Sequence, residues 1–345
     1  MSIKLPSSEQ FLYAANLLVN RLFFKRGYNA SITSILVVKL DEIGDMATAA
    51  HVFELLKINY PNAKLTVLCK PFVKSLIACD PFIDEIITNV AAYKNSYELV
   101  VELRGTWTTL FKSILYKAKY RVARAEVRAA NRGKQLHEIA TNTAIVAPMF
   151  PAVDYAMMPR LYCDKTDEIK VSDFMNQNGL KTFAILHVGA RKILRQWPLE
   201  RFASIATFLK QNYQLDIVFA GTIDDDPQID VVRQSLNFPT YSFTNGFSLS
   251  AFSCLCSKAS FYVGNESGPL HIASAFNVPL LGLFGPGVPS VFYPVSANSK
   301  VLHHVLKCNP CNQIDCVEPQ NPCITRIQVL DAEIAIADLM GRINL

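Results

Sequence analysis

The sequence has 345 residues, of which 50% are hydrophobic and 18% charged, and its formal net charge is +5. This length exceeds the usual size of one compact core, so we predict two domains. The composition excludes an intrinsically disordered chain, and the longest apolar runs have the length of strands, which excludes a membrane-spanning helix.

Residues 1–33 precede the first predicted strand, and we predict a leader helix within them. Its apolar residues share one helical face: Phe11, Leu12, Ala15, Leu18, Val19 and Leu22. Polar residues interrupt the run and no small-residue cleavage site follows it, so the segment does not read as a signal peptide. Two roles stay open. The helix packs on the body of the protein, or it contacts a membrane surface, with Lys25 and Arg26 at its end.

Strands and helices alternate after the leader. The pattern predicts strands at residues 34–40 (SILVVKL), 63–69 and 96–103, and a helix over 45–61 that Pro61 ends. Alternation of this kind is typical of a parallel sheet covered by helices.

A basic segment lies in the same half of the chain. Between Lys112 and Lys134 there are eight Lys or Arg residues and one acid, Glu126. This charge favours an anionic partner for the N-terminal half, although a solvated helix face would look the same. Nucleic acid is not expected, because no binding module or aromatic-interleaved basic motif accompanies the charge.

The alternation restarts after a connection near residues 155–180. Strands are predicted at 182–189, 215–221, 260–265 and 278–285, with helices over 199–213, 249–259 and 268–277. The fold class is therefore α/β, with two Rossmann-like, doubly wound parallel-sheet domains facing a cleft. We place the first domain at 1–165 and the second at 166–330. A C-terminal helix over 331–345 is expected to pack back on the first domain.

Polar residues follow two of these strands, at the sheet edge where ligands bind in such folds. In LDEIGD (residues 40–45), Gly44 permits a sharp turn and Asp45 comes at a helix start, which keeps it ionised and of low basicity. In HVGARKILRQWP (residues 187–198), a glycine turn precedes three cationic residues.

A third strand end, in VGNESGPLHIASAFNVPLLGLFGP, is the most informative. The strand ends at Gly264, and a helix starts at Gly268 with Pro269 in its first turn. Such a helix start suits phosphate, and Glu266 suits the hydroxyls of a sugar or ribose. We infer that the turn holds a sugar nucleotide across its diphosphate. The alternative, in which Ser267 and Glu266 only cap the helix, is weakened by the two other polar strand ends.

Two further motifs leave alternatives open. In FAGTIDDDP, Asp224 or Asp225 is a candidate ribose contact, while a solvated loop or a metal-binding loop would also fit three consecutive aspartates. Four cysteines lie close together near the C-terminus: Cys308, Cys311, Cys316 and Cys323. Their spacing begins like a zinc site but lacks a second CxxC knuckle, so we favour free thiols or a disulfide and keep zinc as the alternative.

These motifs, in this order, resemble glycosyltransferase family 9, the bacterial lipopolysaccharide heptosyltransferases. The resemblance rests on ILVVKLDEIGDMATAAHVFELLKINYP, LHVGA with RQWP, YVGNESGPLHIASAFNVPLLGLFGP and the closing cysteines, and it covers nearly the whole chain. It implies the GT-B architecture, with the acceptor bound by the first domain and the nucleotide sugar by the second. It also implies a metal-independent, inverting transfer of heptose from an ADP-sugar.

The resemblance assigns roles to residues of this chain. Asp45 would be the catalytic base, Arg195 would contact the diphosphate, and Ser267, Gly268 and His271 would form the donor turn. Beside these we expect acceptor binding by Gly44, Arg104 and Arg121. The full donor-binding set that we expect is His187, Gly189, Lys192, Arg195, Gly221, Asp225, Glu266, Ser267, Gly268 and His271. Glu266 stands where the family more often has aspartate, which lengthens the reach of this side chain toward the donor sugar by one methylene.

The expected function is thus sugar transfer to a lipopolysaccharide-core-type acceptor, with no cofactor and no metal. The leaving diphosphate gains negative charge as the bond to the sugar breaks. Stabilisation by Arg195, Lys192 or Arg191 would therefore be stronger in the transition state than in the ground state. We expect a monomer at the cytoplasmic face of the inner membrane, with peripheral membrane contact and an anionic glycolipid acceptor. The alternatives are transfer of another sugar to another bacterial glycan, or sugar-nucleotide binding without catalysis.

Overall fold

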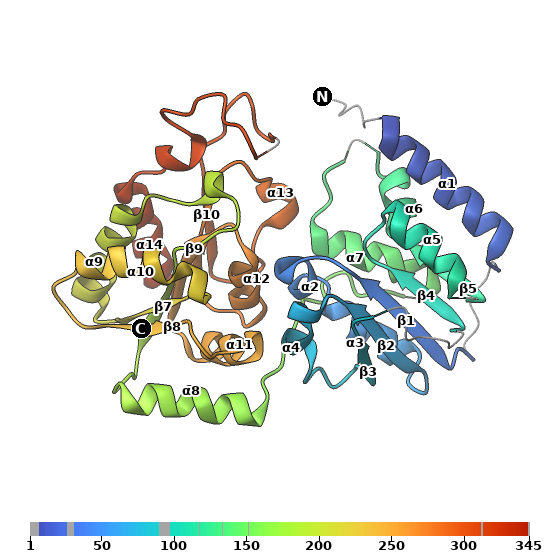
Figure 1. Cartoon of the computed structure of the whole chain (residues 1–345), viewed down its shortest axis with the longest axis horizontal. Helices are drawn as coiled ribbons and strands as arrows, with labels where there is room; N and C mark the ends of the chain where they lie inside the picture. The colour runs from blue at the N-terminus through green and yellow to red at the C-terminus, as the bar shows by residue number, and fades with distance from the viewer. Residues whose placement is uncertain are drawn as a thin grey trace. The chain divides into compact units, whose positions relative to one another are not determined.

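The structure is a computed structural model that describes residues 7–25, 31–89, 97–116, 118–132, 134–150, 152–311 and 313–343. The chain divides into two compact units, residues 1–160 and 161–345, each built on its own sheet (Figure 1). Of the predicted leader, residues 1–6 and 26–30 lie outside the described part, Arg26 among them. No helix in the described ranges is both long and apolar enough to cross a membrane.

The first unit contains a five-stranded parallel sheet with strand order β3-β2-β1-β4-β5. Its strands are β1 (Ser34–Lys39), β2 (Lys64–Cys69), β3 (Glu85–Ile87), β4 (Leu99–Glu102) and β5 (Tyr120–Ala123). Its helices are α1 (Ser7–Phe23), α2 (Ile43–Ala47), α3 (His51–Asn59), η1 (Pro71–Val73), α4 (Lys74–Ile77), α5 (Trp107–Leu115), α6 (Arg124–Ala130), α7 (Glu138–Val146) and η2 (Ala147–Met149). The parallel sheet confirms the interpretation of the alternating pattern.

The helix predicted over residues 45–61 is two helices, α2 and α3, separated by a tight turn at 48–50. The Thr48 hydroxyl donates a hydrogen bond to the backbone oxygen of Asp45 (3.1 Å), and the backbone N–H of Ala49 bonds three residues back, to Met46. Local bonds of this kind compete with the regular helical ladder, so a sequence of good helix formers still breaks here.

Helix α1 packs on α5 and α6 through only part of the apolar face predicted for it. Of that face, Leu12 is buried and Val19 packs against the core, whereas Phe11, Leu18 and Leu22 are exposed. Tyr13 and Asn16, which the prediction did not include, are buried as well. The packed face is more polar than expected because an arginine of β5 reaches it from the sheet, as described below.

The second unit contains a six-stranded parallel sheet with strand order β11-β10-β9-β6-β7-β8. Its strands are β6 (Phe183–His187), β7 (Asp216–Ala220), β8 (Thr240–Phe243), β9 (Phe261–Asn265), β10 (Leu280–Phe284) and β11 (Ser299–His303). Its helices are α8 (Lys165–Gln177), η3 (Ile193–Arg195), α9 (Leu199–Tyr213), η4 (Ile223–Asp225), α10 (Asp226–Gln234), α11 (Leu249–Lys258), α12 (Gly268–Ala275), α13 (Pro289–Phe292), η5 (Cys323–Arg326) and α14 (Val329–Ile343).

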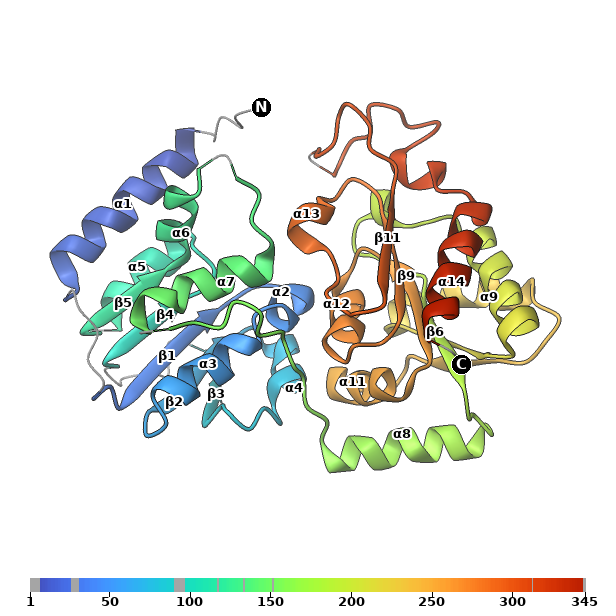
Figure 2. The same ribbon diagram turned by 180° about the vertical axis from the view of Figure 1, so that it is seen from behind.

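The prediction that residues 331–345 pack back on the first domain is wrong. Helix α14 lies against α9, β10 and β11 of the second unit (Figure 2). Ala332, Ile336 and Leu339 belong to the hydrophobic core of that unit and are fully buried. The apolar stripe of α14 thus completes one face of the six-stranded sheet.

Both sheets are doubly wound, and in each the strand order reverses at one place. In the first sheet this switch point lies between β1 and β4, and in the second between β6 and β9. Ligands of doubly wound folds bind outside the carboxyl ends of the strands at such a point. The ends of these four strands are therefore where a site is expected.

Candidate active site

Asp45 lies in α2, the short helix that follows β1 at the first switch point. Burial raises the pKa of Asp45; Lys39 acts to lower it, and Asp41 and Glu138 raise it further. From the helix start alone we predicted a carboxylate of low basicity. The structure corrects this, because burial makes Asp45 a stronger base than an exposed aspartate.

Lys39 is buried and lies between two of the carboxylates that act on Asp45. Its Nζ lies 3.2 Å from Oδ2 of Asp41 and 3.5 Å from Oε1 of Glu138. Arg124 donates two hydrogen bonds of 2.6 Å to Glu138, one to each carboxylate oxygen. Burial alone would raise the pKa of Glu138, but Arg124 and Lys39 outweigh it and lower that pKa to about 2. Glu138 is therefore a fixed negative charge that favours proton uptake by Asp45.

Two of the three predicted acceptor residues lie at the same strand ends as Asp45. Gly44 directly precedes it in α2, and Arg104 follows β4 and forms an ion pair with Asp41. Arg104 is about one-third exposed, so its guanidinium can still meet a ligand.

The third predicted acceptor residue, Arg121, has a different role. It lies on β5 with its side chain fully buried, pairs with Glu102, and donates hydrogen bonds to Asn20 and, at 2.7 Å, to Asn16. An enclosed guanidinium presents no surface to an acceptor, so this prediction is wrong. Arg121 anchors α1 to the sheet.

At the second switch point, Asn265 holds three segments together. Its Oδ1 accepts a hydrogen bond from the backbone N–H of Trp197 (3.0 Å), and its Nδ2 donates to the backbone oxygen of Val188 (2.7 Å). Asn265 is fully buried at the end of β9. One amide thus fixes the end of β6, the start of α9 and the turn before α12 relative to one another.

Glu266 and Arg195 form the charged pair of this site. Nη1 of Arg195 lies 3.3 Å from Oε1 of Glu266, and Oε2 of Glu266 has no hydrogen-bond partner among the described residues. Burial raises the pKa of Glu266 to about 7, against the lowering effects of Arg195 and Lys192. Near neutral pH this carboxyl group can both accept and donate a hydrogen bond.

Two glycines after β10 make room for this pair. A Cβ atom on Gly287 would overlap the carboxylate of Glu266, and one on Gly285 would lie 2.6 Å from the backbone oxygen of Leu194, next to Arg195. Side chains at these positions would displace the pair, which gives a steric reason for both glycines.

Helix α12 begins at Gly268 with Pro269 in its first turn, as predicted. The side chain of its N-cap, Ser267, does not cap the helix; the hydroxyl donates instead to the backbone oxygen of Asn265 (3.1 Å). This argues against the capping alternative, because a helix start that lacks a side-chain cap suits an anionic ligand. His271 lies one turn further along and is buried, with its ring edge-on to Phe292.

The remaining predicted donor residues surround Asp225. Its carboxylate accepts hydrogen bonds from the backbone N–H (2.7 Å) and hydroxyl (3.0 Å) of Thr222, and a Cβ on Gly189 or Gly221 would overlap it. His187 is buried, and its Nδ1 lies 2.8 Å from the backbone oxygen of Ala220. Asp225 therefore closes the turn after β7, a structural role beside the ribose contact predicted for it.

Arg195 also contacts the cysteine-rich segment. Its Nε and Nη2 donate hydrogen bonds of 2.8 and 2.6 Å to Oε1 of Gln313, which lies between Cys311 and Cys316. The cysteine-rich segment is therefore hydrogen-bonded to Arg195, the predicted diphosphate contact, through the side-chain amide of Gln313.

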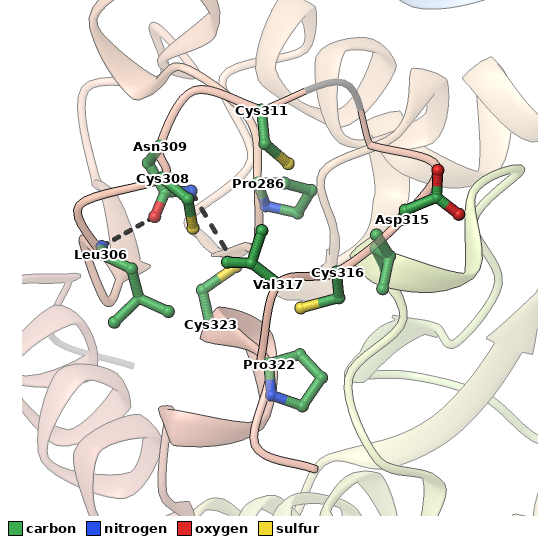
Figure 3. A pocket seen from close by; sticks show the side chains of 11 residues that line it. Pro286, Leu306, Cys308, Asn309, Cys311, Asp315, Cys316, Val317, Pro322 and Cys323 are labelled. Atoms are coloured by element: carbon green, nitrogen blue, oxygen red, sulfur yellow. Dashed lines mark hydrogen bonds between the residues drawn. The ribbon is translucent and has the colours of Figure 1, made fainter. Parts of the chain in front are cut away.

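The four cysteines of this segment, Cys308, Cys311, Cys316 and Cys323, line one pocket (Figure 3). All four are free thiols. Within the described ranges, no three His, Cys, Asp or Glu side chains are arranged to hold a metal ion, so this geometry offers no support for the zinc alternative.

Comparison with known proteins identifies the family. The sequence profile of glycosyltransferase family 9 (heptosyltransferase) matches residues 95–321, which is more than half of the chain. The chain belongs to glycosyltransferase family 9. Lipooligosaccharide heptosyltransferase 2 of Haemophilus influenzae is 24% identical over 320 residues, covering 78% of this chain and 88% of that protein. The family 9 relatives thus match both domains, and the chain is a glycosyltransferase.

Solved structures of family 9 share the architecture. A family 9 glycosyl transferase from Veillonella parvula superposes with a TM-score of 0.79 at 18% identity, covering 92% of this chain and 99% of that one. The ADP-heptose lipopolysaccharide heptosyltransferase II of Escherichia coli gives 0.71 at 19% identity, covering 91% and 100%. The two-domain GT-B fold predicted from the motifs is confirmed.

Several residues of this family 9 site were not singled out by sequence reasoning. Lys39 ends an otherwise apolar strand, and a buried lysine there was a usable signal for a charged cluster. Gly285 and Gly287 flank a proline directly after a predicted strand. Glycines in such a position were a second usable signal, because they indicate a turn with little space for side chains. Glu138 and Gln313 gave no signal, because only the fold brings them to Lys39 and Arg195.

Proposed function

We propose that this glycosyltransferase moves heptose from ADP-heptose to a lipopolysaccharide-core-type acceptor, with inversion and without a metal. The observation that carries the proposal is the Glu266–Arg195 pair beside the start of α12, where a cation and a helix N-terminus can receive a diphosphate. The names of the relatives support heptose as the sugar, since they are heptosyltransferases of lipooligosaccharide and lipopolysaccharide.

Asp45 is the proposed base. An acceptor hydroxyl must lose a proton when it attacks the anomeric carbon, and a carboxylate whose pKa is raised by burial accepts that proton more readily than an ordinary aspartate. Glu42 and Glu102 are poorer candidates: Glu42 lies 2.7 Å from Lys70, and Glu102 is fully buried against Arg121.

Arg195 and the first turn of α12 are proposed to stabilise the leaving ADP. The diphosphate gains negative charge as the glycosidic bond breaks, so these groups act more strongly in the transition state than in the ground state. Lys192 precedes Arg195 at the start of η3, adds a second positive charge near Glu266, and makes a divalent cation unnecessary for countercharge.

The acceptor and location complete the proposal. We infer an anionic glycolipid acceptor and a monomer at the cytoplasmic face of the inner membrane, in peripheral contact with it. The basic surface supports this in part: Arg128, Arg132 and Lys134 are exposed, whereas Arg121 and Arg124 are used inside the domain.

A second candidate is the same reaction with another sugar. It is favoured by Glu266, whose side chain is one methylene longer than the aspartate that the family resemblance implies at this turn. The carboxyl of Glu266 is enclosed by Gly287 and faces Arg195, so the space left for the sugar differs from that beside an aspartate.

Thermal stability with nucleoside diphosphates in EDTA tests the donor part. ADP should raise the melting temperature without metal, since saturation to 100 times Kd adds about 2.7 kcal/mol of stability. UDP and GDP should raise it less. Arg195→Ala should abolish most of the shift, and Arg233→Ala, which removes an equal charge on α10 of the same domain, should preserve it. A strict requirement for Mg²⁺, or a full shift in Arg195→Ala, would contradict the assignment.

A further inference from the structure

Helix α1 leaves part of its apolar surface uncovered, because hydrogen bonds of its polar residues fix which face packs on the domain. Asn16 and Asn20 accept hydrogen bonds from Arg121, and Asn20 also donates to Glu126 of α6. This network fixes the rotation of α1 on the domain. The apolar stripe that would normally be buried is therefore turned to solvent.

The stripe consists of Phe11, Leu18 and Leu22, whose side chains are 71%, 57% and 66% exposed. Their spacing of seven and four residues places them on one face of α1. Three large apolar side chains exposed along a single helix face exceed the scattered apolar residues that are normal on a protein surface.

Helix α5 contacts α1 in the same domain (Figure 1). Its exposed side chains repeat the pattern. Trp107, Phe111 and Leu115 recur every four residues and are 41%, 61% and 73% exposed, and the rings of Trp107 and Phe111 stack with centroids 6.2 Å apart. Two neighbouring helices of the same domain thus present large apolar side chains outward. We call these six residues the α1–α5 apolar face.

Basic residues lie on all three helices of this surface, α1, α5 and α6, and Glu126 of α6 is hydrogen-bonded to Asn20. Arg21 and Lys25 are exposed at the end of α1, Lys112 lies on α5, and Arg128 is exposed on α6. Helix α5 contains no acidic residue. Large apolar side chains bordered by Lys and Arg are the pattern of surfaces that lie in the headgroup region of an anionic bilayer.

We propose that the α1–α5 apolar face docks this domain on an anionic lipid bilayer. A second copy of the chain is the poorer occupant, because a twofold contact would bring the cations that border one face against the same cations of the other. A bilayer supplies the opposite charge, and Trp107 suits its interface. The inference rests on the proposed function in that the acceptor is a membrane glycolipid, and it specifies which surface meets that membrane.

Vesicle co-sedimentation of the full chain tests the proposal. Binding should be strong to vesicles of phosphatidylcholine with one-quarter phosphatidylglycerol, weak to phosphatidylcholine alone, and reduced by 0.5 M salt. The double variant Leu18→Ser/Phe111→Ser should bind the anionic vesicles roughly tenfold or more weakly, since two large apolar contacts are lost. Both side chains are exposed, so folding should be preserved.

The matched control is Ile58→Ser/Ile334→Ser, which removes two similarly exposed apolar side chains, on α3 and α14. It should bind the anionic vesicles within about twofold of the parent. Equal binding by the parent and Leu18→Ser/Phe111→Ser would overturn the proposal, as would a parent dimer in solution that this variant converts to monomer.

The ADP-induced thermal shift, measured on the same proteins, reports separately on the donor site. Absence of this shift would count against the proposed function and leave the vesicle comparison standing.

Discussion

The two switch points carry unlike charge arrangements. At the first, Lys39 and Arg124 are enclosed with Asp41 and Glu138, and every one of these charges has a partner inside the domain. At the second, Glu266 pairs with Arg195, has Lys192 nearby and keeps one oxygen without a hydrogen-bond partner among the described residues, beside a helix start without a side-chain cap. We call the first arrangement, around Lys39, the closed cluster, because its charges are paired inside the domain. We call the second, at Glu266 and Arg195, the open cluster. The charges of the closed cluster shift the pKa of one neighbouring group, whereas those of the open cluster can exchange their partners for a ligand. The first arrangement suits a base and the second suits a diphosphate.

The largest effect should come from removing the base at the closed cluster. Asp45→Asn keeps the size and hydrogen bonding of the side chain but cannot take a proton, so transfer should fall about 100-fold to 10,000-fold. The ADP-induced thermal shift should be unchanged, because the open cluster lies in the other domain. Steady-state rates of ADP release in the presence of acceptor measure the loss.

Asp154→Asn is the control for that substitution, since it makes the same chemical change at an exposed position of the first domain. It should retain the parental rate. If Asp45→Asn keeps more than about a tenth of that rate, Asp45 is not the base, because a general base contributes about a hundredfold or more.

A smaller effect, of a few-fold, should come from the proton on Glu266. Burial raises the pKa of Glu266 in the folded protein to about 7, from an ordinary 4.5. Between pH 4.5 and about 7 the folded protein therefore keeps a proton on Glu266, whereas the unfolded chain has lost it. Its contribution to stability is therefore fully present below 4.5 and lost as pH rises to about 7. A diphosphate anion also favours the protonated form. ADP affinity of the parent relative to Glu266→Gln should then fall as pH rises from 6 to 8.

Calorimetric titrations of parent and Glu266→Gln at each pH measure this ratio, and the titration of ADP itself cancels between the two proteins. A ratio that stays flat across the range would show that Glu266 carries no proton in the free site. A ratio that rises with pH would mean that ADP prefers the ionised carboxylate, which contradicts the open arrangement described for the second switch point.

Much of the fold could be predicted from the sequence because central parallel strands are buried on both faces. Residues 35–38 and 261–264 read as unbroken runs without a charged or strongly polar residue for this reason, and the turns between strands and helices follow from Gly and Pro. The rotation of α1 and the docking of α14 could not be predicted. Both depend on partners that are distant in sequence, Arg121 for α1 and the faces of β10 and β11 for α14.

The site divides in the same way. Asp45, Arg195 and Glu266 could be located because they follow strands, and parallel strands bring their carboxyl ends to one edge. Glu138, whose charge raises the pKa of Asp45, lies 93 residues further along the chain than Asp45. Gln313, which accepts hydrogen bonds from Arg195, lies 118 residues further along than Arg195. No local pattern connects the members of either pair. Spacing in the sequence therefore indicated the candidate side chains, while the fold determined their pairings and raised the pKa values of Asp45 and Glu266.

The central claim is metal-independent heptosyl transfer, and mass spectrometry of the acceptor tests it most directly. Purified full-length protein is incubated with ADP-heptose and a lipopolysaccharide acceptor lacking heptose, in EDTA. The account predicts a product heavier by one heptosyl residue, that is heptose less water, and an equal amount of ADP released. An acceptor left unchanged in EDTA but modified once Mg²⁺ is added would contradict it, as would an acceptor that stays unchanged with ADP-heptose and gains a different sugar from another nucleotide donor.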